Sequence, residues 1–229
     1  MYRVLNISMT GIFLAISFLL SSCGELYSAN KHTILVSAQA KEWFVDLTES
    51  EEFTMLDEHV QPEVFELEYE RTHFNGARYS SGIFDTEEYE FEVIEQEFLS
   101  DKGSDFSIDI ETREPPEGPL LVVEVNNLRY KYDLSYDKII QISTMYGYKF
   151  MHFREGTYRS WDAMDAIYST ASYHDTLMFN DTEYTGVMEF HLLDFEDQWE
   201  DSTITEIIIA KKVGLLKYAM SNGTVMSRR

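Results

Sequence analysis

Residues 120–132, Leu-Leu-Val-Val-Glu-Val-Asn-Asn-Leu-Arg-Tyr-Lys-Tyr, decide the fold class because they predict a complete β-hairpin. Asn126 and Asn127 both tolerate the positive φ that a two-residue hairpin turn requires. With the turn there, apolar residues face apolar residues and opposite charges also meet: Val125 with Leu128, Val123 with Tyr130, Leu121 with Tyr132, and Glu124 with Arg129. The stretch therefore predicts an antiparallel sheet built outward from this hairpin.

Strict alternation of apolar and acidic residues predicts more strands before the hairpin, at 65–70, 88–98 and 106–111. Within 88–98 the alternation changes phase at Val93-Ile94, which predicts a β-bulge there. After the hairpin, 184–193 and 204–210 predict strands, and the second is apolar enough to be buried on both faces. Helical periodicity is nowhere sustained, so the sequence predicts a chain that is nearly all β.

A second hairpin is predicted at Asn222-Gly223, because this dipeptide is the strongest short hairpin signal. A two-residue turn there places Met220 opposite Val225 and Ala219 opposite Met226.

The N-terminus has the pattern of an export signal: Arg3, an apolar run from Gly11 to Leu20, and then Leu20-Ser21-Ser22-Cys23. The run is about half of the ~20 residues that a bilayer span needs. The pattern resembles bacterial lipoprotein signals. This resemblance implies a signal peptide at 1–22, lipidation of Cys23, a lipidated tether at 23–40 and a β-rich domain at 41–229, with a subdivision near 145 as an option. A plain signal peptide cut near Ala29 is the alternative.

Charge and cysteine content exclude several classes of function. Removal of residues 1–22 takes away Arg3 and no acid, so the formal net charge changes from -23 to -24. Nucleic acid is therefore not an expected partner, since phosphate contacts need clustered Lys and Arg. Cys23 is the only cysteine, which excludes a disulfide within the domain and a thiol nucleophile in it.

The C-terminal part contains Phe153-Arg154-Glu155-Gly156-Thr157-Tyr158, then Trp161-Asp162, and later the run from Glu206 to Tyr218. These segments resemble uncharacterised lipoproteins of the Bacteroidetes, over roughly residues 146 to 229. The resemblance implies a Gly-x-Tyr strand start and a strand pair that closes a strongly bent sheet. The expected fold is all-β: an antiparallel, strongly bent sheet or half-barrel with little helix.

Three sets of side chains are candidate binding residues. Aromatic rings that stack on sugars would form a glycan platform, and the candidates are Tyr158, Trp161, Tyr168 and Tyr173. Carboxylates supply the hard oxygen ligands that calcium prefers, and the acidic stretch offers Asp194, Glu196, Asp197 and Asp201 as weak candidates. Asp105, Asp109 and Glu111 share the wet face of one predicted strand and are weaker calcium candidates.

Neither a catalytic nor a transition-metal site is expected. The six histidines occur singly, without His-x-x-x-His or Glu-x-x-His spacing, so no metal is expected on them. The sequence has no Gly-x-Ser-x-Gly elbow, phosphate-binding loop or dinucleotide fingerprint. We therefore expect no cofactor and no enzymatic activity.

These expectations together describe an outer-membrane lipoprotein that acts as a non-enzymatic binding or scaffold component. Its expected partners are the membrane, through the lipid on Cys23, and envelope proteins or glycans. One alternative is a carrier of a lipid or other apolar ligand, held in a half-barrel whose expected lining is Tyr130, Tyr146, Tyr148 and Leu192. A glycan-binding lipoprotein is a further alternative.

Overall fold

The structure is a computed structural model that describes residues 30–47, 51–80, 86–126, 128–144, 151–154, 157–160, 169–192 and 204–229. The chain divides into two compact units. The smaller unit consists of residues up to 33 together with 75–90, and the larger unit of 34–74 together with 91–229. The proposed signal peptide and Cys23 lie outside the described residues. Both sides of position 145 belong to the larger unit.

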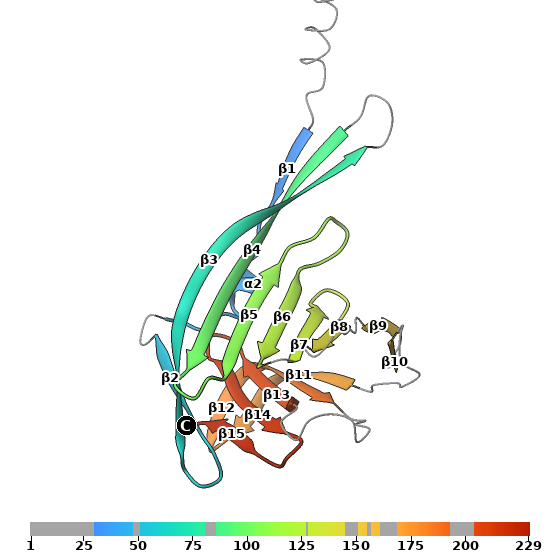
Figure 1. Ribbon diagram of the computed structural model, residues 1–229. Coiled ribbons are helices and arrows are strands. Elements are labelled where there is room, and N and C mark those ends of the chain that lie inside the picture. Colours follow the sequence, from blue (N-terminus) through green and yellow to red (C-terminus); the bar gives the residue numbers. More distant parts are fainter. Residues whose placement is uncertain are drawn as a thin grey trace, which may run out of the picture. The chain divides into compact units, whose positions relative to one another are not determined.

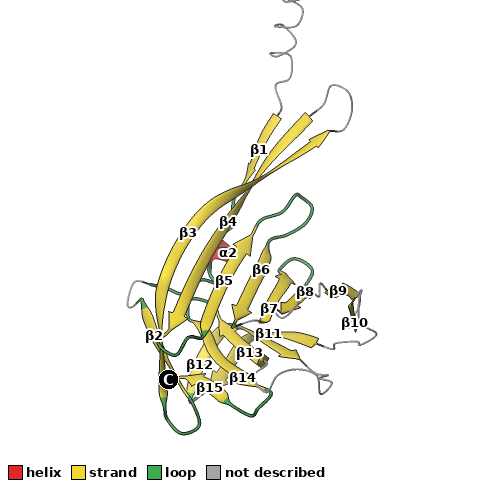
Figure 2. Ribbon diagram, in the orientation of Figure 1, coloured by secondary structure: helices red, strands yellow, loops and turns green. Residues whose placement is uncertain are grey.

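The described chain is nearly all β, as the sequence predicts (Figures 1 and 2). The elements are β1 (Asn30–Ile34), α2 (Ala38–Lys41), β2 (Glu52–Leu56), β3 (Pro62–Ser80), β4 (Thr86–Ser100), β5 (Asp105–Glu111), β6 (Leu120–Val125), β7 (Leu128–Asp133), β8 (Lys138–Thr144), β9 (Met151–Arg154), β10 (Thr157–Ser160), β11 (Ser169–Phe179), β12 (Thr182–Leu192), β13 (Ile204–Ala210), β14 (Gly214–Met220) and β15 (Val225–Arg228). Among the described residues, no helix is long and apolar enough to cross a membrane.

The strands pair antiparallel in the order β10-β9-β8-β7-β6-β5-β4-β3-β2-β15-β14-β13-β12-β11, and β1 also pairs with β4. In the larger unit the sheet bends strongly enough to be nearly closed, which confirms the expected fold class. The two ends of the strand order approach each other: the Tyr130 ring of β7 stacks on the Phe190 ring of β12, with centroids 4.8 Å apart. The larger hydrophobic core cluster therefore lies between both halves of the sheet. A second, smaller cluster contains Val187, Ile208, Ala210 and Leu216.

Alternation along each strand builds this core. In β5, Phe106, Ile108 and Ile110 are completely buried, whereas the residues between them face the other side of the sheet. Phe53 of β2 joins the same cluster and stacks on the Phe65 ring at 5.1 Å. We call the face that contacts this core the inner face of the sheet and the opposite one the outer face.

Residues 35–47, which we call the strap, complete the core before β2 begins. The strap buries Val36, Ala40, Trp43 and Val45 in the core cluster. Buried side chains of β4 hold its backbone: Val36 N donates to Glu92 Oε2 at 2.6 Å, and Val45 N donates to Gln96 Oε1 at 2.8 Å. The described part of the expected tether thus includes β1 and α2, and its end packs against the sheet.

The strap also contacts the C-terminal strands. Asp46 N donates to Lys212 O at 2.8 Å, and Lys212 N donates to Glu42 O at 2.7 Å. Gly214, which follows this turn, has a φ of +79°, and a Cβ there would lie 2.5 Å from Val45 Cγ2. Glycine is therefore required at this position for both its backbone angle and its missing side chain.

The hairpin at Asn126-Asn127 forms with the predicted register. Val125 pairs with Leu128, Glu124 with Arg129 and Leu121 with Tyr132. Asn126 has a φ of +52°, as a tight hairpin turn requires.

The hairpin at Asn222-Gly223 also forms, but its predicted register was wrong by one residue. Ala219 pairs with Val225, and Tyr218 with Met226. The loop holds three residues, since Met220 N donates to Thr224 O at 2.8 Å. Gly223 has a φ of +88°, the left-handed position that such three-residue loops place last.

The pairing of β4 with β5 contains no bulge at Val93-Ile94, contrary to the prediction. The register is continuous from Val93 opposite Glu111 to Leu99 opposite Asp105. The alternation of apolar and acidic residues breaks here for another reason: residues 91–94 are all buried, on both faces of the sheet. Glu92 is on the inner face and is covered by the strap.

Within the smaller unit, side-chain pairs join β1 to β4 and β3 to β4. Lys31 Nζ lies 2.7 Å from Glu90 Oε1, and the His32 ring stacks on Tyr89 with centroids 5.0 Å apart. Arg78 forms an ion pair with Glu88.

Candidate functional site

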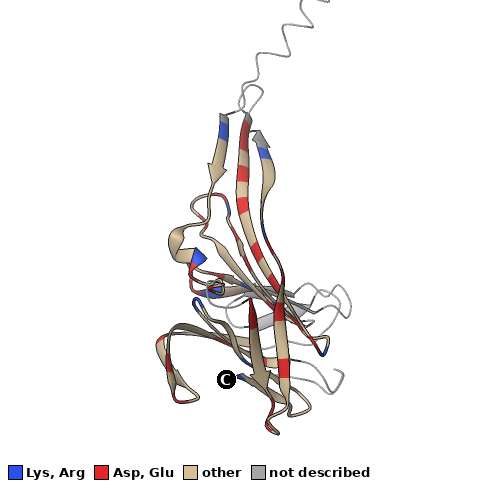
Figure 3. Cartoon of the chain, turned by 90° about the vertical axis from the view of Figure 1, so that its left-hand side faces the viewer, with Lys and Arg blue, Asp and Glu red and all other residues tan. Residues whose placement is uncertain are grey.

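Acidic residues recur along the long strands, whereas Lys and Arg are sparse (Figure 3). In the larger unit, many of the acidic residues lie on the outer face of β3 to β7. Glu95 of β4 pairs with Asp109 of β5, and Glu124 of β6 pairs with Arg129 of β7. Because the alternate residues of these strands fill the core, the sheet presents this polar set on one side.

We call this set the charged face. It contains six carboxylates, three permanent cations, one imidazole and one phenol: Glu95, Glu97, Asp105, Asp109, Glu111 and Glu124; Arg71, Arg129 and Lys131; His73; and Tyr69. Carboxylates therefore outnumber permanent cations two to one.

Arg129 is the central cation of the charged face. Its Nη2 lies 3.1 Å from Asp109 Oδ2 and 3.8 Å from Glu111 Oε1, and its Nε lies 3.8 Å from Glu124 Oε2. The Nε is buried and has no hydrogen-bond partner. Lys131 Nζ donates to both oxygens of Glu111, at 2.9 and 3.0 Å. One guanidinium thus serves three carboxylates, of which it hydrogen-bonds only Asp109.

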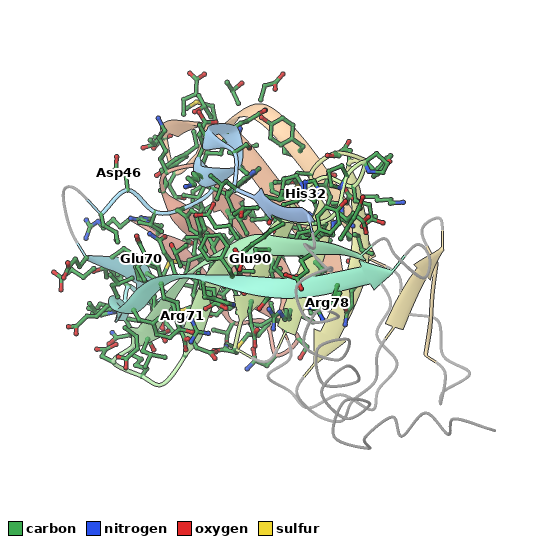
Figure 4. The ribbon with its side chains drawn as sticks, turned by 90° about the horizontal axis from the view of Figure 1, so that it is seen from above. His32, Asp46, Glu70, Arg71, Arg78 and Glu90 are labelled. Carbon is green, nitrogen blue, oxygen red and sulfur yellow. The ribbon has the colours of Figure 1, made fainter. Side chains whose placement is uncertain are left out.

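Strand β3 contributes the opposite edge of the charged face. Figure 4 shows Glu70 and Arg71 on opposite sides of β3. Glu70 accepts a hydrogen bond from Gln96 of the inner face at 2.7 Å, whereas Arg71 pairs with Glu95 on the outer face. His73 Nδ1 lies 3.8 Å from the same Glu95 oxygen. Arg71 is mostly exposed, so this edge is open to solvent.

Asp109 is the most perturbed acid of the charged face. Only 7% of the residue is exposed. Burial raises the pKa of its carboxyl to about 7, Arg129 opposes this, and Glu95, Glu111 and Glu124 add to it. The attraction of Arg129 is therefore weaker than the cost of desolvating the carboxylate.

Neighbouring groups are shifted in the same direction. Burial raises the pKa of Asp105 and of Glu124 above their ordinary values, and nearby carboxylates contribute to both shifts. A hydrogen bond with Glu97, followed by burial, raises the pKa of the Tyr69 hydroxyl to about 12. These shifts all reflect an excess of negative charge that is partly removed from water.

Such a surface is suited to bind cationic side chains. Ammonium and guanidinium groups are strong donors to carboxylates, and their attraction grows where water is excluded. A metal ion is a less suitable ligand, because no group of three or more His, Cys, Asp or Glu among the described residues is placed to hold one.

The aromatic residues expected to bind glycans are only partly described. Tyr173 lies in β11, is 43% exposed and packs edge-on against the Trp43 ring, with centroids 6.4 Å apart. The backbone of Tyr158 is in β10. Trp161 and Tyr168 lie outside the described residues. Of the four, the structure brings only Tyr173 to a described aromatic partner, and that partner is a core residue.

The acidic stretch expected to offer calcium ligands, with Asp194, Glu196, Asp197 and Asp201, lies outside the described residues. Tyr146 and Tyr148, two residues of the expected lipid-binding lining, lie outside as well. The other two, Tyr130 and Leu192, belong to the core cluster. The Tyr130 ring is fully buried against Phe190, so this part of the inner face is filled by the protein's own side chains.

Two histidines that the sequence separates come together on the outer face of β11 and β12. His174 Nε2 lies 3.2 Å from Glu189 Oε2, and His191 Nε2 lies 3.7 Å from the same oxygen. Sequence spacing missed this, because His174 and Glu189 meet only through the pairing of two strands.

The charged face itself was only partly visible in the sequence. The register of the 120–132 hairpin predicts that Glu124 faces Arg129, and alternation places Asp109 and Glu111 on a wet face. The sequence gives no sign that Arg71 of β3 joins them, nor that Asp109 is buried. Comparison with known proteins adds no further assignment: the chain matches no family model, no curated protein and no solved structure.

Proposed function

We propose that the protein is a lipid-anchored component of the bacterial outer membrane that binds a basic protein segment through the charged face and performs no catalysis. The observation that carries the proposal is the charged face, where six carboxylates meet three permanent cations. A partner that presents Lys or Arg side chains would supply the missing positive charge.

Burial strengthens this argument. Carboxylates that are already partly desolvated have little hydration left to lose when a partner binds, so less of the electrostatic gain is cancelled. Asp109 and Glu95 have side chains only 10% and 16% exposed. Arg71, by contrast, is exposed and able to move aside for an incoming cation.

The anchor is supported by the lipobox ending at Cys23. Several acyl chains would hold the protein on the membrane almost permanently. A carrier of apolar ligands and a glycan-binding protein remain alternatives. The charged face favours a basic protein partner over both, because it offers neither an apolar lining nor exposed aromatic rings in a row.

The test is binding of a defined basic probe to the full lipidated chain in detergent micelles. The probe is a synthetic peptide of eight lysines alternating with glycines, and affinity is measured by biolayer interferometry. We expect wild-type protein to bind, with affinity that falls as salt rises from about 50 to 300 mM because exposed charges are screened.

A pair of matched double variants locates the surface. Glu95→Gln with Glu124→Gln removes two charges from the charged face, and we expect roughly tenfold weaker binding. Glu58→Gln with Glu183→Gln removes two exposed charges elsewhere in the larger unit and should bind as wild type does. Equal loss in both variants, or no binding by wild type, would refute the proposal.

A further inference from the structure

We propose that uptake of a proton by Asp109 regulates the charged face, weakening its hold on a basic partner as the pH falls below neutrality. This inference rests on the proposed function, and it names the regulation of the same surface.

The position of Asp109 makes it the centre of the charged face. It lies in the middle of β5, directly opposite Glu95 of β4 and Val122 of β6. It is nearly buried, and its hydrogen-bond partner on the charged face is Arg129. Keeping a carboxylate charged in such a buried position costs free energy, and the Arg129 guanidinium is the partner that offsets this cost.

Groups from every neighbouring strand face Asp109 or the pairs beside it. They are Tyr69, Arg71 and His73 from β3, Glu95 and Glu97 from β4, Asp105 and Glu111 from β5, Glu124 from β6, and Arg129 and Lys131 from β7. Glu95, Glu111 and Glu124 repel the charge on Asp109, and Arg129 is the cation that opposes them most directly. Loss of one negative charge relieves all three repulsions at once.

Protonation of Asp109 changes how Arg129 is shared. With Asp109 neutral, the guanidinium keeps Glu111 and Glu124 as its charged neighbours, each 3.8 Å away. It then neutralises a larger share of these two carboxylates, whose side chains are more exposed than that of Asp109. Counting the six carboxylates against the three permanent cations, the formal charge changes from -3 to -2. A basic partner therefore meets a less negative surface.

The direction of the pKa shift supports a response near neutrality. Burial raises the pKa of Asp109 to about 7. An ordinary surface aspartate would stay charged throughout the range in which most proteins work.

The experiment measures affinity for the lysine-glycine peptide from pH 5.5 to 8.5 at constant ionic strength, with the full lipidated chain. We expect wild-type affinity to fall about fivefold from pH 8.5 to 5.5, with a midpoint near 7. In the same range, NMR of protein labelled with ¹³C at aspartate carboxyls should show one aspartate titrating with that midpoint. Asp109→Asn should remove that titration and bind at all pH values as wild type does at pH 5.5.

Control variants separate Asp109 from other groups. His73→Asn should keep the pH step, because the step is assigned to Asp109 and not to the one imidazole of the charged face. Asp175→Asn, an exposed aspartate on β11, should keep it too.

The outcomes separate the two proposals. No binding at any pH overturns the proposed function. Binding without a pH step overturns only the regulation. The same conclusion follows if the step persists in Asp109→Asn or is lost in His73→Asn. If Asp109→Asn does not fold, the carboxyl titration in wild type still decides: no aspartate with a midpoint near 7 refutes the inference.

Discussion

Replacement of Asp109 by asparagine should change how the stability of the protein depends on pH. The carboxyl has an ordinary pKa of 3.8 and a folded-state pKa of about 7. Between these values the folded state binds more protons than the unfolded state, so the free energy of unfolding decreases as the pH rises. The contribution of Asp109 is most favourable below 3.8 and is lost as the pH rises through about 7.

The size of the effect follows from the same two values. Between these two pKa values, the free energy of unfolding decreases by about 1.4 kcal/mol for each pH unit. From pH 5.5 to 7, wild type should therefore lose about 2 kcal/mol relative to Asp109→Asn, and above pH 7 the difference should become constant. Asparagine keeps the shape and polarity of the side chain but cannot titrate.

Urea unfolding followed by tryptophan fluorescence, at half-unit steps from pH 5.5 to 8.5, measures this difference. Asp175→Asn serves as the control, since it removes an exposed aspartate and should run parallel to wild type. If Asp109→Asn also runs parallel to wild type over the whole range, Asp109 does not titrate near neutrality and the reasoning from its burial is refuted.

Three further predictions concern the strap and the anchor. Gly214→Ala should lower the free energy of unfolding by about 2 kcal/mol or more, since it strains a positive φ and drives a Cβ into Val45; equal urea midpoints for variant and wild type would contradict this. Gln96→Leu should cost about 1–3 kcal/mol because both polar backbone groups of Val45 lose their partner, and amide exchange should quicken at Val45 in particular. Cys23→Ala should move the protein from the detergent phase to the aqueous phase in Triton X-114 partitioning, and a variant that stays in the detergent phase would argue against lipidation.

Short-range patterns predicted the strands well because alternation and turn chemistry act locally. The Asn126-Asn127 hairpin has the predicted register, since both residues suit a two-residue turn and every facing pair is compatible. The Asn222-Gly223 hairpin was misaligned because Gly223 takes the third place of a longer loop rather than the second place of a short one. A dipeptide alone does not distinguish these two turns.

Long-range arrangement is the part that local patterns miss. The break in alternation at Val93-Ile94 was interpreted as a bulge, because the sequence does not reveal that the strap covers Glu92. In the same way, alternation predicts that Asp109 faces solvent, whereas in the structure it is buried and pairs with Arg129 of β7. The sequence therefore predicted the Glu124–Arg129 pair and the acids of β5, but not the contacts of Arg129 with Asp109 and Glu111 or the pair of Arg71 with Glu95.

If Cys23 carries the proposed lipid, the start of the strap limits how far the larger unit can lie from the membrane. Val36 already belongs to the core cluster of the larger unit. Thirteen peptide steps separate Cys23 from Val36, and a fully extended chain of that length spans about 45 Å. With a lipid on Cys23, Val36 would lie no farther than this distance from the bilayer. This limit favours partners that are themselves embedded in or bound to the same membrane.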